Sequence, residues 1–171
     1  MSTENIIISR VSSKKEMKQF VRFNYELYKD NPYAVPDLLE DTLDTFNKKK
    51  NPAFRFCEAE WFLARRNGKI VGRICAIINH KANEQWNQKT VRFGWIDFID
   101  DTEVSGLLLQ AVEDWGKERG MNKMVGPLGF TDMDLEGMLT EGYDQLSTMN
   151  SIYNYPYYPE HMVKHGLTKE V

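Results

Sequence analysis

One long segment of the chain has the hydrophobic period of a helix. The apolar positions at i, i+3, i+4, i+7, i+8 and i+11 are Val104, Leu107, Leu108, Ala111, Val112 and Trp115. This spacing places all of them on one face of an α-helix. Gly120 follows shortly afterwards and is typical of a helix end. The pattern predicts an amphipathic helix that ends at Gly120.

Three other segments have helix signals. Ser13 and Glu16 have the spacing of a capping box and predict a helix that starts there and stops at Asn31-Pro32. Residues 37–46 predict a second, short helix. Residues 157–166 predict a last helix whose C-cap is Gly166.

Strand patterns fill the remaining segments as far as residue 128. Residues 5–11 are rich in β-branched side chains, and apolar side chains alternate along 91–98. Asn67-Gly68 suits a type I′ turn and predicts a hairpin from about residue 57 to 80. Residues 121–128 predict a short buried strand, whereas residues 126–154 are irregular or partly helical.

The order of these elements predicts an α/β protein with a mixed sheet and helices on both faces. A chain of 171 residues fits a single domain, here residues 1–171. The pattern of a new strand begins at residues 166–171, where the sequence stops, so we expect the chain to be the N-terminal part of a longer protein.

Composition excludes several classes of function. The 42% hydrophobic and 27% charged residues are ordinary for a globular protein. A net charge of −3 argues against nucleic acid as a partner. The N-terminus has no signal-peptide pattern, and no apolar run reaches the length of a membrane span. We therefore expect a cytoplasmic protein with no membrane segment; the oligomeric state stays open.

Cys57 and Cys75 are the two cysteines of the chain. Simple pairing across the predicted hairpin sets Cys75 opposite Glu60, so a disulfide between the cysteines is not expected. Buried, reduced thiols are the favoured interpretation.

The element order and two segments resemble the GNAT superfamily of acyl-CoA-dependent N-acyltransferases. The segments are "LLLQAVEDWGKERGM" at 107–121 and "YYPEHMVKHGL" at 157–167. The resemblance implies a mixed, mostly antiparallel central sheet flanked by helices on both faces. It also implies acetyl-CoA or another acyl-CoA as co-substrate, a small-molecule amine as acceptor, and no metal.

The loop that holds the cofactor pyrophosphate in this family departs from its pattern here. The family pattern is [Gln/Arg]-x-x-Gly-x-[Gly/Ala], which falls on Asp100, Glu103 and Ser105 of this chain. Carboxylates repel a pyrophosphate, whereas Asp101 or Thr102 can cap the helix. The sequence therefore favours a helix start that fills its own anion site, and the pyrophosphate loop is degenerate.

The resemblance also implies cofactor contacts from a strand, from the helix start and from an amide near the cofactor arm. The residues at these positions are Trp95, Ile96, Asp97, Thr102, Val104, Ser105 and Asn154. Since the strand contacts are made by backbone groups, they survive changes of side chain.

The catalytic residue is not fixed by the resemblance. Family members place a tyrosine four residues before the late glycine, where this chain has Met162. Tyr158 lies about one turn earlier and is a candidate, with aromatic packing around Pro156 and Pro159 as the favoured alternative.

Residues 126–146 are rich in acidic side chains. Asp132 and Asp134 lie there, and no Lys or Arg occurs between Lys123 and Lys164. Such a surface attracts an amine, and either aspartate is a candidate base. A solvated acidic loop is the alternative.

His161 and His165 share a helix face. No third ligand accompanies them, so a solvated helix end is favoured over a metal site.

Two functions remain at this stage. One is an acyl-CoA-dependent N-acyltransferase that acts on an amine. The other is a catalytically silent GNAT-like domain that binds a ligand or a protein.

Overall fold

The computed structural model describes residues 5–148 and 151–170 of the chain. Its centre is a five-stranded sheet in the order β1-β2-β3-β4-β5. The strands are β1 (Ile6–Arg10), β2 (Cys57–Arg66), β3 (Lys69–Asn79), β4 (Thr90–Phe98) and β5 (Lys123–Val125). Neighbours pair antiparallel except β4 and β5, which are parallel. The prediction of a mixed, mostly antiparallel sheet is confirmed.

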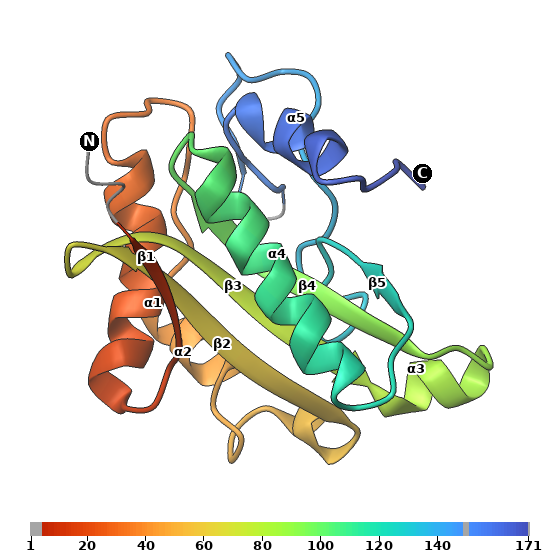
Figure 1. The fold of residues 1–171 in the computed structure, drawn as a ribbon. Coiled ribbons are helices and arrows are strands. Elements are labelled where there is room, and N and C mark those ends of the chain that lie inside the picture. The colour runs from red at the N-terminus through yellow and green to blue at the C-terminus, as the bar shows by residue number, and fades with distance from the viewer. Residues whose placement is uncertain (1–4, 149–150, 171) are drawn as a thin grey trace.

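Helices cover both faces of this sheet (Figure 1). They are α1 (Lys14–Tyr28), α2 (Leu39–Thr45), α3 (His80–Gln85), α4 (Thr102–Lys117) and α5 (Tyr157–Lys164), with a 3₁₀ turn at Pro52–Arg55. Helix α4 crosses one face, and α1 and α2 lie on the other (Figure 1). The predicted flanking of the sheet on both faces is therefore confirmed.

Two hydrophobic cores follow from this layering. Val104, Leu108 and Val112 of α4 pack in one core with apolar side chains of the sheet. Phe20 and Val21 of α1 pack in the other. The i, i+4, i+8 spacing seen in the sequence is the buried face of α4.

Helix α1 is capped as the sequence predicts, with one difference. The Ser13 hydroxyl accepts a hydrogen bond from the Glu16 backbone N–H at 3.1 Å. The Glu16 carboxylate reaches the backbone N–H of Ser12 at 2.8 Å, one residue before the position of a standard capping box.

The hairpin between β2 and β3 turns at Asn67 and Gly68, whose φ angles are 50° and 75°. Positive φ at both residues is what a type I′ turn requires, so the predicted turn is confirmed.

The register of the hairpin differs from simple pairing. Cys75 lies opposite Trp61, whereas the sequence prediction placed it opposite Glu60. A register shift next to Arg65 moves the pairing by one residue, which sequence alone does not show. Cys57 and Cys75 are both buried and free, as predicted.

The later part of the chain has less regular structure than its length suggests. Strand β5 has three residues and is partly exposed, so the strand is shorter and less buried than the predicted one over 121–128. The reason is that β5 pairs with β4 alone. Helix α3 was not predicted; the Asn79 side chain caps it by accepting from the Ala82 N–H at 2.9 Å.

None of the helices described here is long and apolar enough to cross a membrane.

Candidate functional site

The antiparallel pairing between β3 and β4 is interrupted by a β-bulge in β4. Arg73 pairs with Asp97 and Cys75 pairs with Gly94, so Trp95 and Ile96 together face only one residue of β3. Trp95 has φ 43°, which is uncommon for a residue other than glycine. The bulge therefore takes the backbone of Trp95 and Ile96 out of the regular β3–β4 ladder.

A cavity of about 470 Å³ lies beside this bulge. Its wall is formed by the end of α1, residues 34–37, β4 at 95–97, residues 135–138 and residues 151–154. The volume lies within the range of small-molecule sites, roughly 300–1,000 Å³. The bulged backbone of β4 is thus part of a space that can hold a ligand.

A buried ion pair lies in the wall of the cavity. Arg73 Nε donates to Asp97 Oδ2 at 2.8 Å, and Arg73 Nη2 forms an ion pair with the same oxygen at 2.7 Å. Asn24 of α1 donates to the same oxygen at 3.1 Å. Arg73 Nη1 also donates to the backbone oxygen of Phe20 at 3.0 Å. This network fastens α1, β3 and β4 together at the bulge.

Tyr158 of α5 completes the network. Its hydroxyl donates to Asp97 Oδ1 at 2.7 Å, and its ring stacks on Phe98 with centroids 4.4 Å apart. Burial, together with the nearby Asp97 carboxylate, raises the pKa of Tyr158 well above its usual range. The residue is therefore a neutral phenol that both packs and lines the cavity.

Asn154 also lines the cavity, and its amide is occupied by neighbouring backbone. Its Oδ1 accepts from Leu139 N at 2.6 Å, and its Nδ2 donates to the backbone oxygens of Leu139 and Tyr155 at 3.2 and 3.1 Å. The Asn154 side chain therefore holds the backbone at Leu139 next to that at Tyr155.

The start of α4 is capped by its own acid. Asp101 Oδ1 accepts from the Glu103 N–H at 2.9 Å, and its Oδ2 pairs with Arg66 at 2.5 Å. The Arg66 hydrogen bond holds the pKa of Asp101 below its usual value. Of the two caps that the sequence allows, the structure uses Asp101 rather than Thr102.

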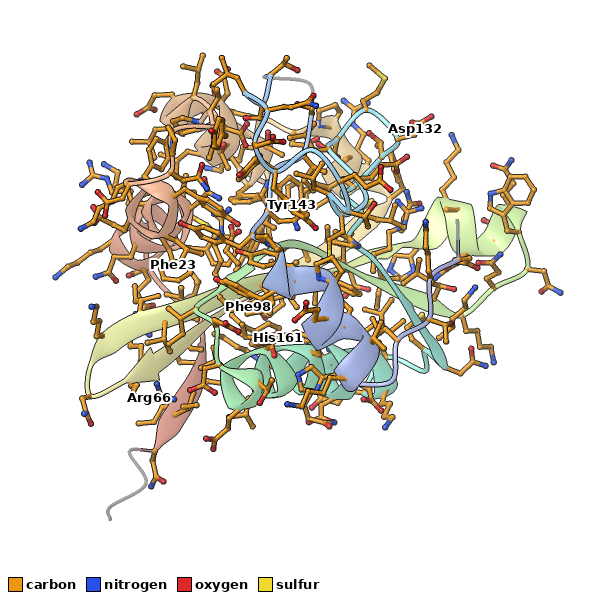
Figure 2. The ribbon with its side chains drawn as sticks, turned by 90° about the horizontal axis from the view of Figure 1, so that it is seen from above. Phe23, Arg66, Phe98, Asp132, Tyr143 and His161 are labelled. Atoms are coloured by element: carbon orange, nitrogen blue, oxygen red, sulfur yellow. The ribbon has the colours of Figure 1, made fainter. Side chains whose placement is uncertain are left out.

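Ser105, in the first turn of α4, joins α4 to α5. Its hydroxyl lies 2.8 Å from His161 Nδ1 and 2.8 Å from His165 Nε2. His161 Nε2 lies 2.8 Å from Asp100 Oδ1. Figure 2 shows α5, with His161, lying over this part of the molecule near Phe98. Burial lowers the pKa of His165.

The prediction of a solvated helix end at these histidines is wrong for His161, which is only 4% exposed. The i, i+4 spacing of the two histidines is visible in the sequence. Their contact with Ser105 is not, because Ser105 lies 56 residues before His161. Within the described parts of the chain, no group of three or more His, Cys, Asp and Glu side chains is arranged to hold a metal ion.

The residues expected to contact a cofactor therefore fall into two places. Trp95, Ile96, Asp97, Asn154 and the candidate Tyr158 line the cavity. Thr102, Val104 and Ser105 are not among its lining residues; Val104 lies in the core and Ser105 is fully buried. Their assignment to a cofactor stays a prediction.

Asp132 and Asp134 do not line the cavity either. Asp134 Oδ2 accepts from the Thr131 N–H at 3.1 Å and so closes a local turn. Asp132 is exposed and lies at the periphery of the molecule (Figure 2).

An acid that sequence reasoning missed does lie in the wall of the cavity. Asp37 precedes α2, and its backbone oxygen accepts a hydrogen bond from the Tyr25 hydroxyl. Partial enclosure raises the pKa of the Asp37 carboxyl, while the nearby Arg73 opposes this shift. The segment is also held from a distance, because the Ser147 N–H donates to the Tyr33 backbone oxygen and the Val35 N–H donates to the Ser147 hydroxyl. No local pattern indicates that contact.

Two curated proteins are similar to the chain in sequence. Protein YghO of Escherichia coli K12 is 32% identical over 159 residues, which is 93% of this chain and 40% of that protein. The "Bacterial ceramide synthase" of Caulobacter vibrioides is 33% identical over 135 residues, 78% of this chain and 35% of that protein. The chain thus spans well under half the length of these relatives. No model of a known protein family matches it.

Solved structures identify the fold. A tandem GNAT protein from the clavulanic acid biosynthesis pathway matches with a TM-score of 0.58 and 11% identity, over 95% of this chain and 43% of that one. The "predicted acetyltransferase with acetyl-CoA" of Clostridium acetobutylicum matches with a TM-score of 0.52 and 13% identity, over 73% and 82%. The chain has a GNAT-like fold.

Proposed function

We propose that the chain carries the acyl-transfer site of an acyl-CoA-dependent N-acyltransferase. The observation that carries this proposal is the bulge of β4, which opens at Trp95 and Ile96 onto a cavity beside Asp97 and Tyr158. The GNAT-like fold supports it, because a GNAT-like neighbour has been solved with acetyl-CoA.

The bulge suits the acyl end of the co-substrate. The β3–β4 register gives no partner to Trp95 or Ile96, and both residues line the cavity. We propose that their backbone N–H groups face the acyl group. Backbone N–H groups that point at a thioester carbonyl stabilise the oxyanion formed during acyl transfer. Holding the thioester next to an amine in one cavity supplies the remaining advantage through proximity.

The start of α4 does not suit the diphosphate end. Its Glu103 N–H is occupied by Asp101, and the cap carries a carboxylate where a phosphate would approach. We therefore propose that the diphosphate binds elsewhere than on the first turn of α4.

Tyr158 is assigned a positioning role in this proposal. A phenol has one proton to donate, and that of Tyr158 is given to Asp97. The raised pKa of Tyr158 also makes it a poor acid towards a leaving thiolate. The side chain orients Asp97 and forms part of the wall against which the acyl group lies.

The acceptor is proposed to be an amine that bears an alkyl chain. Apolar side chains line much of the cavity, and Val35 and Leu135 leave 43% and 39% of their surface exposed. One relative is named a ceramide synthase, and a ceramide is the fatty amide of a long-chain amino alcohol. The apolar lining and this relative support the same class of acceptor.

A catalytically silent binding domain is the second candidate function. The acid-capped start of α4 favours it, because that feature removes the family's usual phosphate contacts.

Calorimetric titration of the full-length protein with acetyl-CoA, palmitoyl-CoA and free CoA tests the proposal, followed by release of CoA thiol in the presence of sphinganine. We expect binding of an acyl-CoA and amine-dependent thiol release. Binding without transfer to any amine supports the silent domain, and no binding of any CoA compound overturns the proposal.

A further inference from the structure

Three carboxylate side chains line the cavity among the described residues: Glu26, Asp37 and Asp97. An amine acceptor reaches the site as an ammonium ion at neutral pH, so one of these groups has to receive it. The three carboxylates differ in how many ion pairs and hydrogen bonds they already make within the protein.

Asp97 is largely occupied by partners within the protein. Its Oδ2 accepts from Arg73 and Asn24, and its Oδ1 accepts from Tyr158. The guanidinium of Arg73 also neutralises its charge, at 2.7 Å. An ammonium ion placed here would displace a buried partner.

Glu26 is exposed and lies 4.0 Å from Lys29, which follows it by one helical turn. Its side chain is 75% exposed, so water screens its charge. A group in this position adds little to the binding of a cation inside the cavity.

Asp37 differs from both. Within residues 5–148 and 151–170, its carboxylate has no hydrogen bond and no ion pair, while its backbone oxygen is held by Tyr25. Arg73 and Asp97 line the same cavity as Asp37. Asp37 is an exposed residue at the edge of the cavity, and its acceptor oxygens remain available.

We propose that Asp37 binds the ammonium group of the acceptor and takes its proton. This assignment rests on the proposed N-acyltransferase function. One proton of the ammonium ion passes to the Asp37 carboxylate, and the resulting amine attacks the thioester carbonyl carbon. The C–N bond forms, the C–S bond breaks, and the second proton lost by nitrogen leaves with the thiolate as CoA thiol. The Asp37 carboxyl then releases its proton to water.

The test is a calorimetric titration of n-dodecylamine into the full-length protein and into two variants. Asp37→Asn keeps the shape of the side chain and removes its charge. Glu26→Gln is the matched control, because it removes a charge from the same cavity wall. We expect about 10- to 100-fold weaker amine binding for Asp37→Asn, as for a lost charge-assisted hydrogen bond. Glu26→Gln is expected within about twofold of the parent protein.

Equal binding by Asp37→Asn and the parent protein overturns the assignment, and so does an equal loss in Glu26→Gln. Absence of amine binding by the parent protein overturns it too. Titration of acetyl-CoA into the same three proteins distinguishes failure of the Asp37 assignment from failure of the proposed function. We expect Asp37→Asn to bind acetyl-CoA as the parent protein does. If the parent protein binds no acyl-CoA, the proposed function is refuted, and the amine titration alone then tests whether Asp37 binds an ammonium group.

Discussion

Removing the charge of Asp97 is expected to destabilise the protein strongly. In Asp97→Asn the Arg73 guanidinium stays charged, and its side chain is only 6% exposed. One amide oxygen then replaces two carboxylate oxygens as acceptor for Arg73, Asn24 and Tyr158. The variant leaves a buried cation without its counter-ion.

The magnitude follows from this burial. Breaking a buried ion pair by removing one partner costs about 3–5 kcal/mol of unfolding free energy. For a domain of this size, each kcal/mol lowers Tm by roughly 2–4 °C, so we expect a fall of about 6–20 °C. Both side chains are almost fully buried, so solvent screening does not reduce the figure.

Thermal unfolding and urea titration of four proteins measure the effect: the parent, Asp97→Asn, Arg73→Met and the double variant. The double variant has no orphan charge, so its loss should be smaller than the sum of the single losses by about 2 kcal/mol or more. Asp132→Asn serves as the control for loss of an exposed acid and should change stability by less than about 0.5 kcal/mol. A loss below about 1 kcal/mol in Asp97→Asn, or additive single losses, refutes the reasoning.

Three further predictions concern other parts of the fold. Burial raises the pKa of Cys57 to about 11 and that of Cys75 well above its usual range. Neither thiol should therefore react with Ellman's reagent in the folded protein, whereas both should react in concentrated guanidinium chloride. Rapid reaction of the native protein would contradict this prediction. Burial lowers the pKa of His165, so the unfolded chain takes up its proton first, and stability should fall as pH drops through about 6.5. His165→Gln should flatten that part of the stability-against-pH curve, and an unchanged slope argues against the assignment. A Cβ on Gly94 would lie 2.4 Å from the Leu128 carbonyl oxygen, so Gly94→Ala should lower the unfolding free energy by about 1–3 kcal/mol in urea titration; wild-type stability would show that β4 has room there.

Most of the fold could be predicted from patterns among neighbouring residues. The α4 stripe and the Asn67-Gly68 turn are properties of neighbouring residues, and both are confirmed. The register shift beside Arg65 moved Cys75 by one place because a bulge has no sequence signal of its own here.

The candidate site was less predictable because it depends on contacts between distant segments. The resemblance placed Trp95 at the site, and the structure adds the bulge that opens it to the cavity. His161 was taken for a solvated residue since Ser105 and Asp100 are far away in sequence. Asp37 was the first residue of the predicted helix 37–46 and had no functional signal in the sequence, whereas the structure places it in the cavity wall, which Asp132 does not line.

The most direct test of the central claim compares acyl transfer in two variants that each add an arginine to an exposed apolar position. Leu135→Arg places its charge at the cavity, where it repels an ammonium ion and disrupts the apolar lining. Val163→Arg places the same side chain on α5 outside the cavity. The assay follows CoA thiol release from palmitoyl-CoA with sphinganine. The account predicts that kcat/KM falls about 10-fold or more in Leu135→Arg and stays near the parent value in Val163→Arg. Equal activity of the two variants, or a parent protein that transfers no acyl group, contradicts it.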